Sequence, residues 1–239
     1  MKQNENLVLV GSKAILVPYK PEHVKIYHDW MASPFLQEMT ASEPLTLEEE
    51  YDMQKSWHED DRKCTFIILA LKSQHTPLEK KMTMKDIREK TMMIGDVNIF
   101  LNDCDDDLTF GEIEIMIAEE GYRRNGYGLE GLKMMMAYAL KELGIKTFHA
   151  KISMKNQPSI HLFENKLAYY PVSTSEIFQE TTLEWSIQQQ KDTDTNEDEE
   201  DNYGSKATNE QRQACQALYD SLMDLWNSDI KTLDWDNLE

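Results

Sequence analysis

Short apolar runs alternate along the chain with segments in which apolar side chains recur at helical spacing. Runs rich in β-branched and aromatic residues are typical of strands, whereas a period of three to four residues is typical of amphipathic helices. The runs predict strands over residues 14–18, 64–69, 92–101, 108–118, 146–153, 169–173 and 181–187. The helical spacing predicts helices over residues 22–31, 46–57, 129–143 and 210–226, with another opening near residue 156. We therefore expect an α/β fold in which a mixed central sheet of about seven strands is flanked by helices.

Particular residues mark where these helices begin or end. Thr46 and Glu49 form a capping box, in which the hydroxyl and the carboxylate each accept a hydrogen bond from a free backbone N–H group. Asn156 is a good N-cap residue, and Pro158 suits the first turn of the helix that follows. Gly144 comes after the run 129–143 and can adopt the left-handed conformation of a C-cap.

Two polar segments interrupt the pattern. Residues 73–91 have no clear period and predict a long loop, with a short helical turn near residues 85–90. Residues 103–107 form an aspartate-rich turn, but they lack the ligand spacing and the closing glutamate of a calcium-binding EF-hand loop. The six histidines show no metal-binding spacing such as HExxH. We therefore expect no metal site.

Composition divides the chain into three parts. Residues 188–239 contain 14 acidic and 4 basic side chains, and the stretch up to residue 209 has few apolar residues. Such a stretch cannot bury enough apolar surface to fold by itself. We expect a globular domain over residues 1–187, an acidic disordered linker over residues 188–209 and a C-terminal helical extension over residues 210–239. Whether the last helix docks on the domain or on a partner stays open.

The net charge of the whole chain is −19. This disfavours nucleic acid as a partner, because proteins neutralise its phosphates with Lys and Arg. No apolar run approaches the roughly 20 residues that a membrane span needs, so we expect no membrane partner. The polar first residues lack the apolar core of a secretory signal, and the three cysteines are widely spaced, as is typical of reduced thiols. These features predict a cytoplasmic protein, and they are compatible with a nuclear pool.

The strongest chemical signal is the stretch from Arg123 to Gly128, between a predicted strand and a predicted helix. The first N–H groups of a helix have no intrahelical acceptor and form a binding site for anions. Gly126 and Gly128 would let a phosphate approach the backbone, and Arg123 and Arg124 add positive charge. The spacing differs from the GxGxxG pattern of dinucleotide-binding proteins. An ordinary strand–turn–helix connection is the other interpretation.

The same stretch resembles the signature Arg/Gln-x-x-Gly-x-Gly/Ala of the GCN5-related N-acetyltransferase (GNAT) superfamily. Residues 156–167, NQPSIHLFENKL, resemble a second segment of that superfamily, and the order of elements matches over residues 8–187. Within the superfamily, the chain most resembles the eukaryotic N-acetyltransferase 9 group, described as acetylating tubulin. The stretches similar to that group are residues 7–11, 40–48, 95–101 and 111–119. The resemblance implies a GNAT fold.

The resemblance also implies a reaction, in which an acetyl group passes directly from acetyl-CoA to an amine of a protein or peptide. The N-terminus of tubulin is one candidate acceptor, acetyl-CoA is the co-substrate, and we expect a monomer. The backbone of Met116, Ile117 and Ala118 would bind the pantetheine arm. The pyrophosphate would be held by Arg123, Arg124, Asn125, Gly126, Tyr127, Gly128 and Leu129. Asn156, Ser159 and Phe163 would approach the pantetheine or its thiol end.

Direct transfer needs a base for the attacking ammonium and a proton donor for the leaving thiolate. Glu112 and Glu114 lie two residues apart on a predicted strand and therefore share one face. Either carboxylate could be the base, with Glu112 preferred; the alternative is that both only pair with surface cations. The superfamily often has a tyrosine acid where this chain has Phe163, so water, Tyr169, Tyr170 or another tyrosine would have to donate.

The missing tyrosine and the acidic tail keep a second function open. The chain could be an acyl-CoA-binding protein without turnover, or an interaction module that uses its C-terminal helix. Release of CoA in the presence of an acceptor peptide would separate these functions from that of a transferase.

Overall fold

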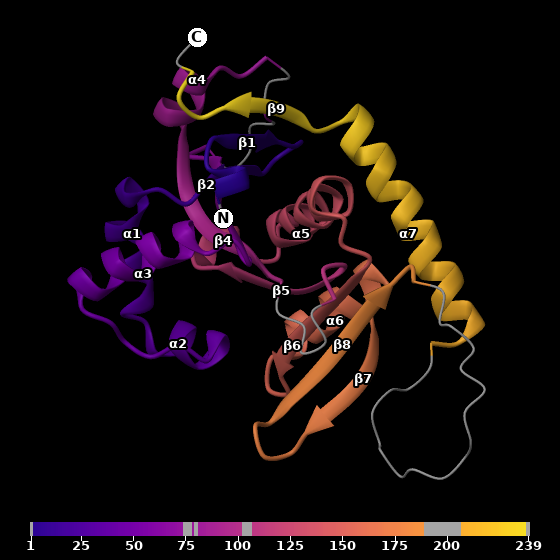
Figure 1. The fold of residues 1–239 in the computed structure, drawn as a ribbon. Coiled ribbons are helices and arrows are strands. Elements are labelled where there is room, and N and C mark those ends of the chain that lie inside the picture. The colour runs from indigo at the N-terminus through magenta and orange to yellow at the C-terminus, as the bar shows by residue number, and fades with distance from the viewer. Residues whose placement is uncertain (1, 74–77, 79–80, 102–106, 189–206, 238–239) are drawn as a thin grey trace.

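One nine-stranded sheet forms the centre of the molecule (Figure 1). The computed structural model describes residues 2–73, 78, 81–101, 107–188 and 207–237. The strands are β1 (Leu7–Val10), β2 (Ile15–Pro18), β3 (Lys63–Leu71), β4 (Thr91–Phe100), β5 (Phe110–Ile117), β6 (Thr147–Ser153), β7 (Tyr170–Ser175), β8 (Glu180–Ser186) and β9 (Lys231–Asp234). Their order is β7-β8-β6-β5-β4-β3-β2-β1-β9. The pair β5–β6 is parallel and the other neighbours are antiparallel, so the sheet is mixed.

Seven α-helices cover the two faces of this sheet in the described part of the chain. They are α1 (Val24–Met31), α2 (Pro34–Thr40), α3 (Leu47–Glu59), α4 (Met84–Lys90), α5 (Tyr127–Tyr138), α6 (Gln157–Leu167) and α7 (Asn209–Ser228). Shorter turns are η1 (Lys2–Asn4), η2 (Pro21–His23), η3 (Glu120–Tyr122) and the π-helical η4 (Ala139–Leu143). Helices α1 to α4 pack into one buried cluster and α5 to α7 into the other. This arrangement confirms the predicted α/β fold.

The predicted helix ends are present. The Thr46 Oγ1 accepts a hydrogen bond from Glu49 N at 3.3 Å, and Glu49 Oε2 accepts one from Thr46 N at 2.8 Å. At the start of α6, Asn156 Oδ1 accepts from Ser159 N at 3.3 Å. Gly144 has φ 71° and ends η4 in the left-handed conformation. Local signals are therefore sufficient to place these helix ends.

The sequence patterns did not predict α2, β1 or β9. α2 has only seven residues, with Ser33 as its N-cap and Pro34 as its first residue. β1 and β9 have four residues each, which is too short to show a strand period, and they pair with one another at the edge of the sheet. The sheet therefore has nine strands where about seven were expected. The aspartates of residues 103–106 and the acidic segment 189–206 lie outside the described residues.

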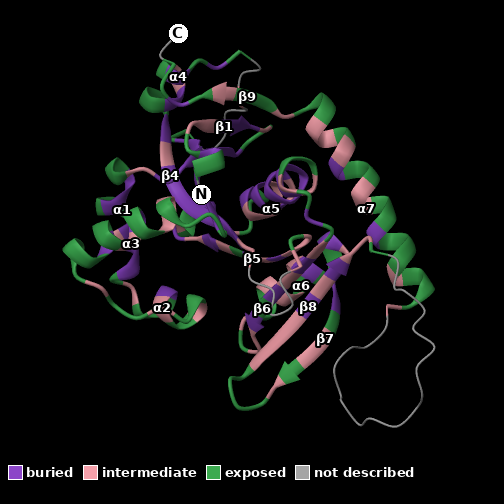
Figure 2. Cartoon of the chain, viewed as in Figure 1, coloured by how far each residue is buried: buried purple, intermediate pink, exposed green. Residues whose placement is uncertain are grey.

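The C-terminal helix docks on the same chain. α7 packs against α5 on the side away from the sheet (Figure 1). Leu222 and Cys215 are buried, and the ring centroids of Trp226 and Tyr138 are 6.1 Å apart. Burial is confined to part of α7, whereas α5 is buried along most of its length (Figure 2). β9 then extends the sheet, and Trp235 enters the cluster on the other face. The C-terminal segment thus contributes side chains to the buried clusters on both faces of the sheet.

The parallel pair β5–β6 is short. Pairing covers only Phe110–Gly111–Glu112 against Thr147–Phe148–His149, although β5 continues to Ile117 and β6 continues to Ser153. The two strands therefore diverge, and the second half of β5 has a free edge toward β6.

A glycine and a bulge shape β4 on the other side of β5. The register between β3 and β4 shifts beside Gly95, so that Ile94 is an additional residue in β4. A Cβ atom at Gly95 would lie 1.9 Å from Met116 O. Only glycine permits this close approach, and bulges that bend a strand are frequent beside active sites.

Candidate active site

A cavity of about 910 Å³ lies where β5 and β6 diverge. Its walls come from α2, the end of β5, the segment leading into α5 and the beginning of α6. Several apolar side chains line it, and Arg123, Arg124 and Lys166 provide positive charge. Its volume lies within the range of ligand and cofactor sites, roughly 300–1,000 Å³.

The beginning of α5 opens into this cavity. Gly126 is the N-cap with φ 83°, a left-handed conformation that glycine adopts without strain. The first intrahelical hydrogen bond runs from Glu130 N to Gly126 O at 3.0 Å. The N–H groups of Tyr127, Gly128 and Leu129 therefore have no intrahelical acceptor, and together with the helix dipole they favour an anion.

The Arg123 side chain contributes positive charge to the cavity and also donates hydrogen bonds to the backbone. Its Nε donates to Ile117 O at 2.8 Å, and its Nη2 donates to Ala118 O at 2.9 Å. The guanidinium also lies 5.1 Å from the ring of Phe35 on α2. Arg123 thus fixes the end of β5 and connects it to the opposite wall. Arg124 is exposed and has φ 62°, so the turn before α5 is tight.

Most of the predicted acetyl-CoA contacts line the cavity. They are Met116, Ile117, Arg123, Arg124, Gly126, Gly128, Leu129, Asn156 and Ser159. Ala118 and Tyr127 are instead buried, and the amide of Asn125 donates to Gly121 O and Arg123 O. Phe163 is also buried, with its ring 4.9 Å from that of Tyr169. The three buried residues pack behind the cavity wall, whereas Asn125 is exposed and its amide hydrogen bonds hold the turn before α5.

The two candidate bases differ in their partners. Glu112 Oε2 accepts a hydrogen bond from Lys151 Nζ on β6 at 2.8 Å, which occupies this carboxylate. Glu114 is exposed, yet it lies among many protein atoms, and this desolvation raises the pKa of its carboxyl. The positive charges of Lys63 and Lys151 oppose the rise and the charge of Glu112 adds to it. Glu114 is also nearer to Met116, the next residue on its face and part of the cavity wall.

A row of buried polar side chains continues from Glu114 across the sheet. The register places Asn98 opposite Glu114 and Thr65 opposite Asn98, so the three share one face. Asn98 Oδ1 accepts from Thr65 Oγ1 at 2.6 Å, and Asn98 Nδ2 donates to Asp96 Oδ2 at 2.6 Å. Burial raises the pKa of Asp96 to about 7. The row ends beside Lys63, whose Nζ lies 3.1 Å from the centroid of the Trp57 ring.

The tyrosines considered as proton donors are engaged elsewhere. Tyr169 is buried with its hydroxyl directed at Met136 Sδ, and the Tyr170 hydroxyl donates to Glu184 Oε1 at 2.6 Å. Tyr122 lines the cavity, but its hydroxyl donates to Leu71 O at 3.0 Å. Within the described part of the chain, the cavity wall thus offers no tyrosine hydroxyl free to protonate a leaving group.

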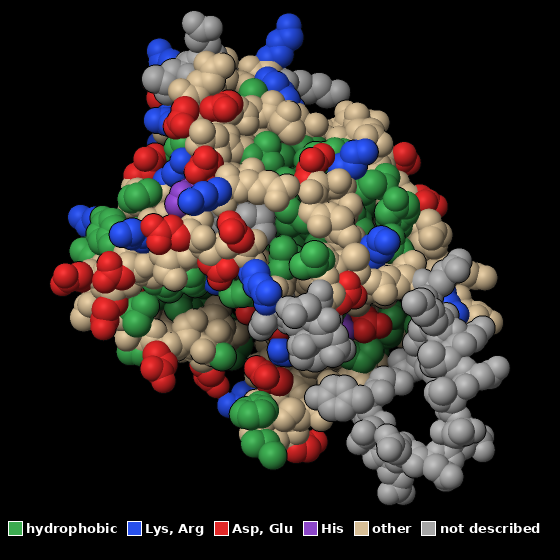
Figure 3. Space-filling view, in the orientation of Figure 1, with side chains coloured by type: hydrophobic (Ala, Val, Ile, Leu, Met, Phe, Trp, Pro, Cys, Tyr) green, Lys and Arg blue, Asp and Glu red, His purple; other side chains and the backbone are tan. Residues whose placement is uncertain are grey.

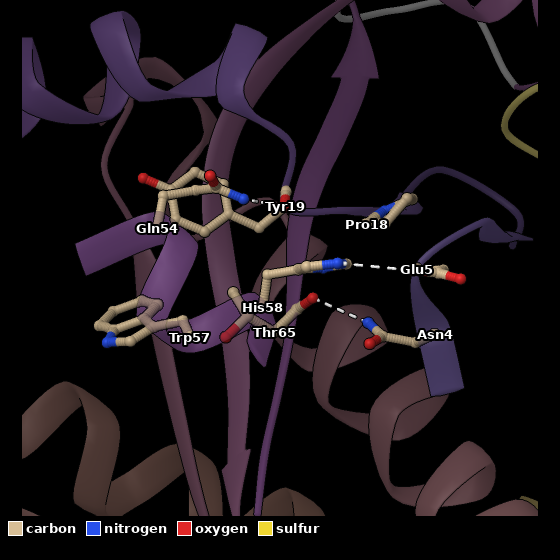
Figure 4. Close-up of a pocket in the computed structure, with 8 residues that line it drawn as sticks. All are labelled: Asn4, Glu5, Pro18, Tyr19, Gln54, Trp57, His58 and Thr65. Carbon is tan, nitrogen blue, oxygen red and sulfur yellow. Dashed lines mark hydrogen bonds and ion pairs between the residues drawn. The ribbon is translucent and has the colours of Figure 1, made fainter. Parts of the chain in front are cut away.

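A second, much smaller cavity lies between η1, β2, β3 and α3 (Figure 4). Its volume of about 10 Å³ is close to that of a single water probe. Its polar groups bond across it, with Asn4 Nδ2 donating to Thr65 O at 2.9 Å and His58 Nε2 3.4 Å from Glu5 Oε2. This space is too small for a substrate.

The family model of the acetyltransferase (GNAT) domain matches residues 13–165 of this chain. The chain belongs to the GNAT family of acetyltransferases. It is 49% identical over 188 residues to the alpha/beta-tubulin-N-acetyltransferase 9 of Homo sapiens, covering 78% of this chain and 86% of that protein. An N-acetyltransferase 9-like protein of Nematostella vectensis is 49% identical over 185 residues, covering 77% and 88%. The chain is an N-acetyltransferase.

The fold of this acetyltransferase is shared with solved structures of low sequence identity. The spermidine N-acetyltransferase of Vibrio cholerae, solved in complex with CoA and spermine, has a TM-score of 0.57 and 13% identity. The match covers 72% of this chain and 93% of the Vibrio cholerae chain. A Bacillus halodurans protein has a TM-score of 0.60 and 12% identity, and covers 93% of this chain and 97% of its own.

Sequence reasoning missed two parts of the acetyltransferase site. Phe35, Leu36 and Met39 on α2 form a wall of the cavity, and an ion pair of 3.0 Å from Glu38 to Lys155 joins α2 to the loop before α6. Their helical spacing after a Ser-Pro start could have revealed α2. Lys13, near Gly126, could not have been found, because only the tertiary fold brings the two together.

The described residues contain no cluster of three or more His, Cys, Asp or Glu side chains suited to a metal ion. None of the helices described in this acetyltransferase combines the length and apolar character needed to cross a bilayer.

Proposed function

We propose that this acetyltransferase uses acetyl-CoA to acetylate a protein amine, with the N-terminus of tubulin as the first candidate acceptor. The observation that carries the proposal is the cavity at the divergence of β5 and β6, which meets the amino end of α5. A long ligand with an anionic end fits such a site, because one wall is apolar and the mouth is cationic. The names of the curated relatives support the choice of tubulin.

The proposed donor fits the residues that line the cavity. The first N–H groups of α5 would hold the pyrophosphate, aided by Arg124 and by the remaining N–H groups of Arg123. The free edge of β5 at Ile115 to Ile117 would accept the amide groups of the pantetheine arm. Asn156 and Ser159, at the start of α6, lie on the other side of the arm.

We assign the general base to Glu114 and not to Glu112. The raised pKa of Glu114 makes its carboxylate a stronger base, whereas the carboxylate of Glu112 is held by Lys151 at 2.8 Å. Glu114 would take one proton from the acceptor ammonium, directly or through a water, and leave the amine able to attack. Asn98 and Thr65 lie beside it on the same face and would orient the acceptor.

Bound acetyl-CoA supplies a thioester whose C–S bond breaks as the N–C bond to the amine forms. The electron pair of the broken bond leaves with the sulfur, and water is the proton source for the thiolate, since the nearby tyrosine hydroxyls are engaged. The low basicity of a thiolate makes a strong protein acid unnecessary. Correct placement of the two reactants then supplies much of the rate.

The test compares Glu114→Gln with the matched variant Glu112→Gln. Release of CoA is measured with peptides that carry tubulin N-terminal sequences, and acetyl-CoA affinity is measured by calorimetry. We expect Glu114→Gln to lower kcat about 100-fold, as is usual for loss of a general base, with unchanged acetyl-CoA affinity. Glu112→Gln should change kcat less than about fivefold, because it removes one partly exposed ion pair.

The pH dependence gives a second measure of the same assignment. Because Glu114 must be ionised to act, turnover should fall on acidification, starting at a higher pH than for an ordinary glutamate. Equal losses in the two variants would contradict the choice of Glu114. Acetyl-CoA binding without acetylation of any peptide or protein would favour the alternative of a binding protein without turnover.

A further inference from the structure

The turn between β1 and β2 is fastened to the first turn of α5 through Glu130. Glu130 accepts three backbone hydrogen bonds from this turn: Ser12 N at 2.5 Å, Lys13 N at 3.1 Å and Ala14 N at 3.2 Å. The approach is so close that a Cβ atom at Gly11 would lie 2.6 Å from Glu130 Oε1. A carboxylate with three N–H donors is firmly placed, and so is the turn that provides them.

This attachment brings the side chain of Lys13 to the beginning of α5. Its Nζ lies 3.5 Å from Asn125 O, and a Cβ atom at Gly126 would be 3.4 Å from it. Gly126 is both the N-cap of α5 and part of the cavity wall. The ammonium group therefore lies at the rim of the cavity, on the side of α5 that faces the β1–β2 turn.

The charge of Lys13 is available to a ligand. Lys13 is exposed and forms no ion pair with any residue that the structure describes. Arg123, in contrast, uses Nε and Nη2 for the carbonyl groups of Ile117 and Ala118. Glu130 belongs to the same first turn of α5 as the free N–H groups. Its negative charge would oppose an anion there, and the positive charge of Lys13 offsets it.

We propose that Lys13 binds the pyrophosphate of acetyl-CoA. It would be a cationic contact from outside the glycine motif, and Glu130 holds the turn that carries it in place. This inference rests on the function proposed above. It adds the β1–β2 turn to the donor site, far from the motif in sequence. The ammonium group of Lys13 would donate to a phosphate oxygen from the β1–β2 turn, and the first N–H groups of α5 would donate to the same pyrophosphate from the amino end of the helix.

The experiment measures acetyl-CoA affinity by calorimetry at low and high salt for Lys13→Gln, Lys13→Arg and Lys141→Gln. Lys141 is an exposed lysine at the far end of the α5–η4 helix, so its substitution makes the same change in net charge. We expect Lys13→Gln to raise Kd about tenfold at low salt, as for loss of one charged hydrogen bond, with a smaller effect at high salt. Lys13→Arg should remain near the parent, and so should Lys141→Gln.

Acetyl-CoA that lacks the 3′-phosphate identifies the phosphate involved. If Lys13 binds the pyrophosphate, Lys13→Gln raises the Kd of this analogue by the same factor as the Kd of acetyl-CoA. Loss of the effect with the analogue would move the contact to the 3′-phosphate and overturn the assignment. Equal affinities of Lys13→Gln and Lys141→Gln would overturn the role of Lys13 while leaving the proposed function intact. Failure of the parent protein to bind acetyl-CoA would instead contradict the proposed function itself.

Discussion

Asp96 is a carboxyl group buried beside the proposed base. It is 2% exposed, and its Oδ1 has no hydrogen-bond partner among the described residues. Burial raises its pKa to about 7, the charge of Glu114 adds to the rise, and the hydrogen bond from Asn98 opposes it. Asp96 thus titrates near neutral pH in the folded protein, whereas an aspartate in the unfolded chain titrates near 4.

This difference predicts how Asp96→Asn changes stability with pH. Below about pH 4, Asp96 is protonated in both the folded and the unfolded protein, so the difference between its two pKa values has no effect on stability. As pH rises from 4 to 7, Asp96 ionises in the unfolded protein first, which favours unfolding. The stability of Asp96→Asn relative to the parent should therefore rise by roughly 2–4 kcal/mol between pH 4 and pH 7. Urea unfolding across this range measures it, with the exposed Asp61→Asn as control. A constant difference would show that the pKa of Asp96 is not raised in the folded protein.

Among the elements, α7 is the one whose place the sequence left undecided. It covers α5, the helix whose first turn forms part of the proposed donor site. Leu222 is fully buried in that contact and Trp226 packs against Tyr138. Because α5 lies between the sheet and α7, the C-terminal helix completes the burial of α5 (Figure 2).

Leu222→Ala therefore tests whether α7 is docked in solution. Removing a fully buried leucine should lower the free energy of unfolding by about 2–4 kcal/mol, since the contact with α5 would be left with a cavity. Ser221→Ala, at the exposed neighbouring position, should stay within about 0.5 kcal/mol of the parent. The measurement is urea unfolding by fluorescence. A similar small effect of both substitutions would mean that α7 is detached.

On the scale of the whole molecule, the first and last strands, β1 and β9, pair at one edge of the sheet (Figure 1). Trp235, just after β9, packs edge-on against His23 with the ring centroids 5.5 Å apart. Arg88 lies over the same indole at 4.6 Å and donates to Trp235 O at 3.0 Å. Burial lowers the pKa of His23 to about 4, and the charges of Arg88 and Lys20 add to this effect.

His23 should make the folded protein sensitive to acid. Its pKa is lowered in the folded state, so the unfolded state binds the proton first as pH falls below about 6.5, and stability decreases down to about pH 4. His23→Gln should remove roughly 3 kcal/mol of that decrease. Thermal unfolding at several pH values, with the exposed His161→Gln as control, checks this. The same decrease in His23→Gln as in the parent would exclude His23 as its source.

Surface charge also belongs to this scale. Acidic side chains spread over the face seen in Figure 3, with Lys and Arg scattered among them, as the net charge of −19 implies. Positive charge at the proposed donor site is therefore a local feature of the fold. It depends on Arg123, Arg124 and Lys13 being brought together in a molecule that is otherwise acidic.

The sequence by itself determined the elements whose signals are local. Thr46 and Asn156 cap their helices, Gly126 takes its left-handed conformation, and the signature from Arg123 to Gly128 identifies the family, because each depends on neighbours within a few residues. Short elements without a clear period, such as α2 and β1, gave no comparable signal.

Only the tertiary structure decided the contacts between distant segments. Glu112 and Glu114 look alike in sequence, and the ion pair with Lys151 on the neighbouring strand is what separates them. Likewise, β9 exists as a strand because β1 offers it an edge, and Lys13 reaches Gly126 because Glu130 holds the turn. Such contacts join residues that lie far apart along the chain, and burial and charge at those contacts set the chemistry of the site.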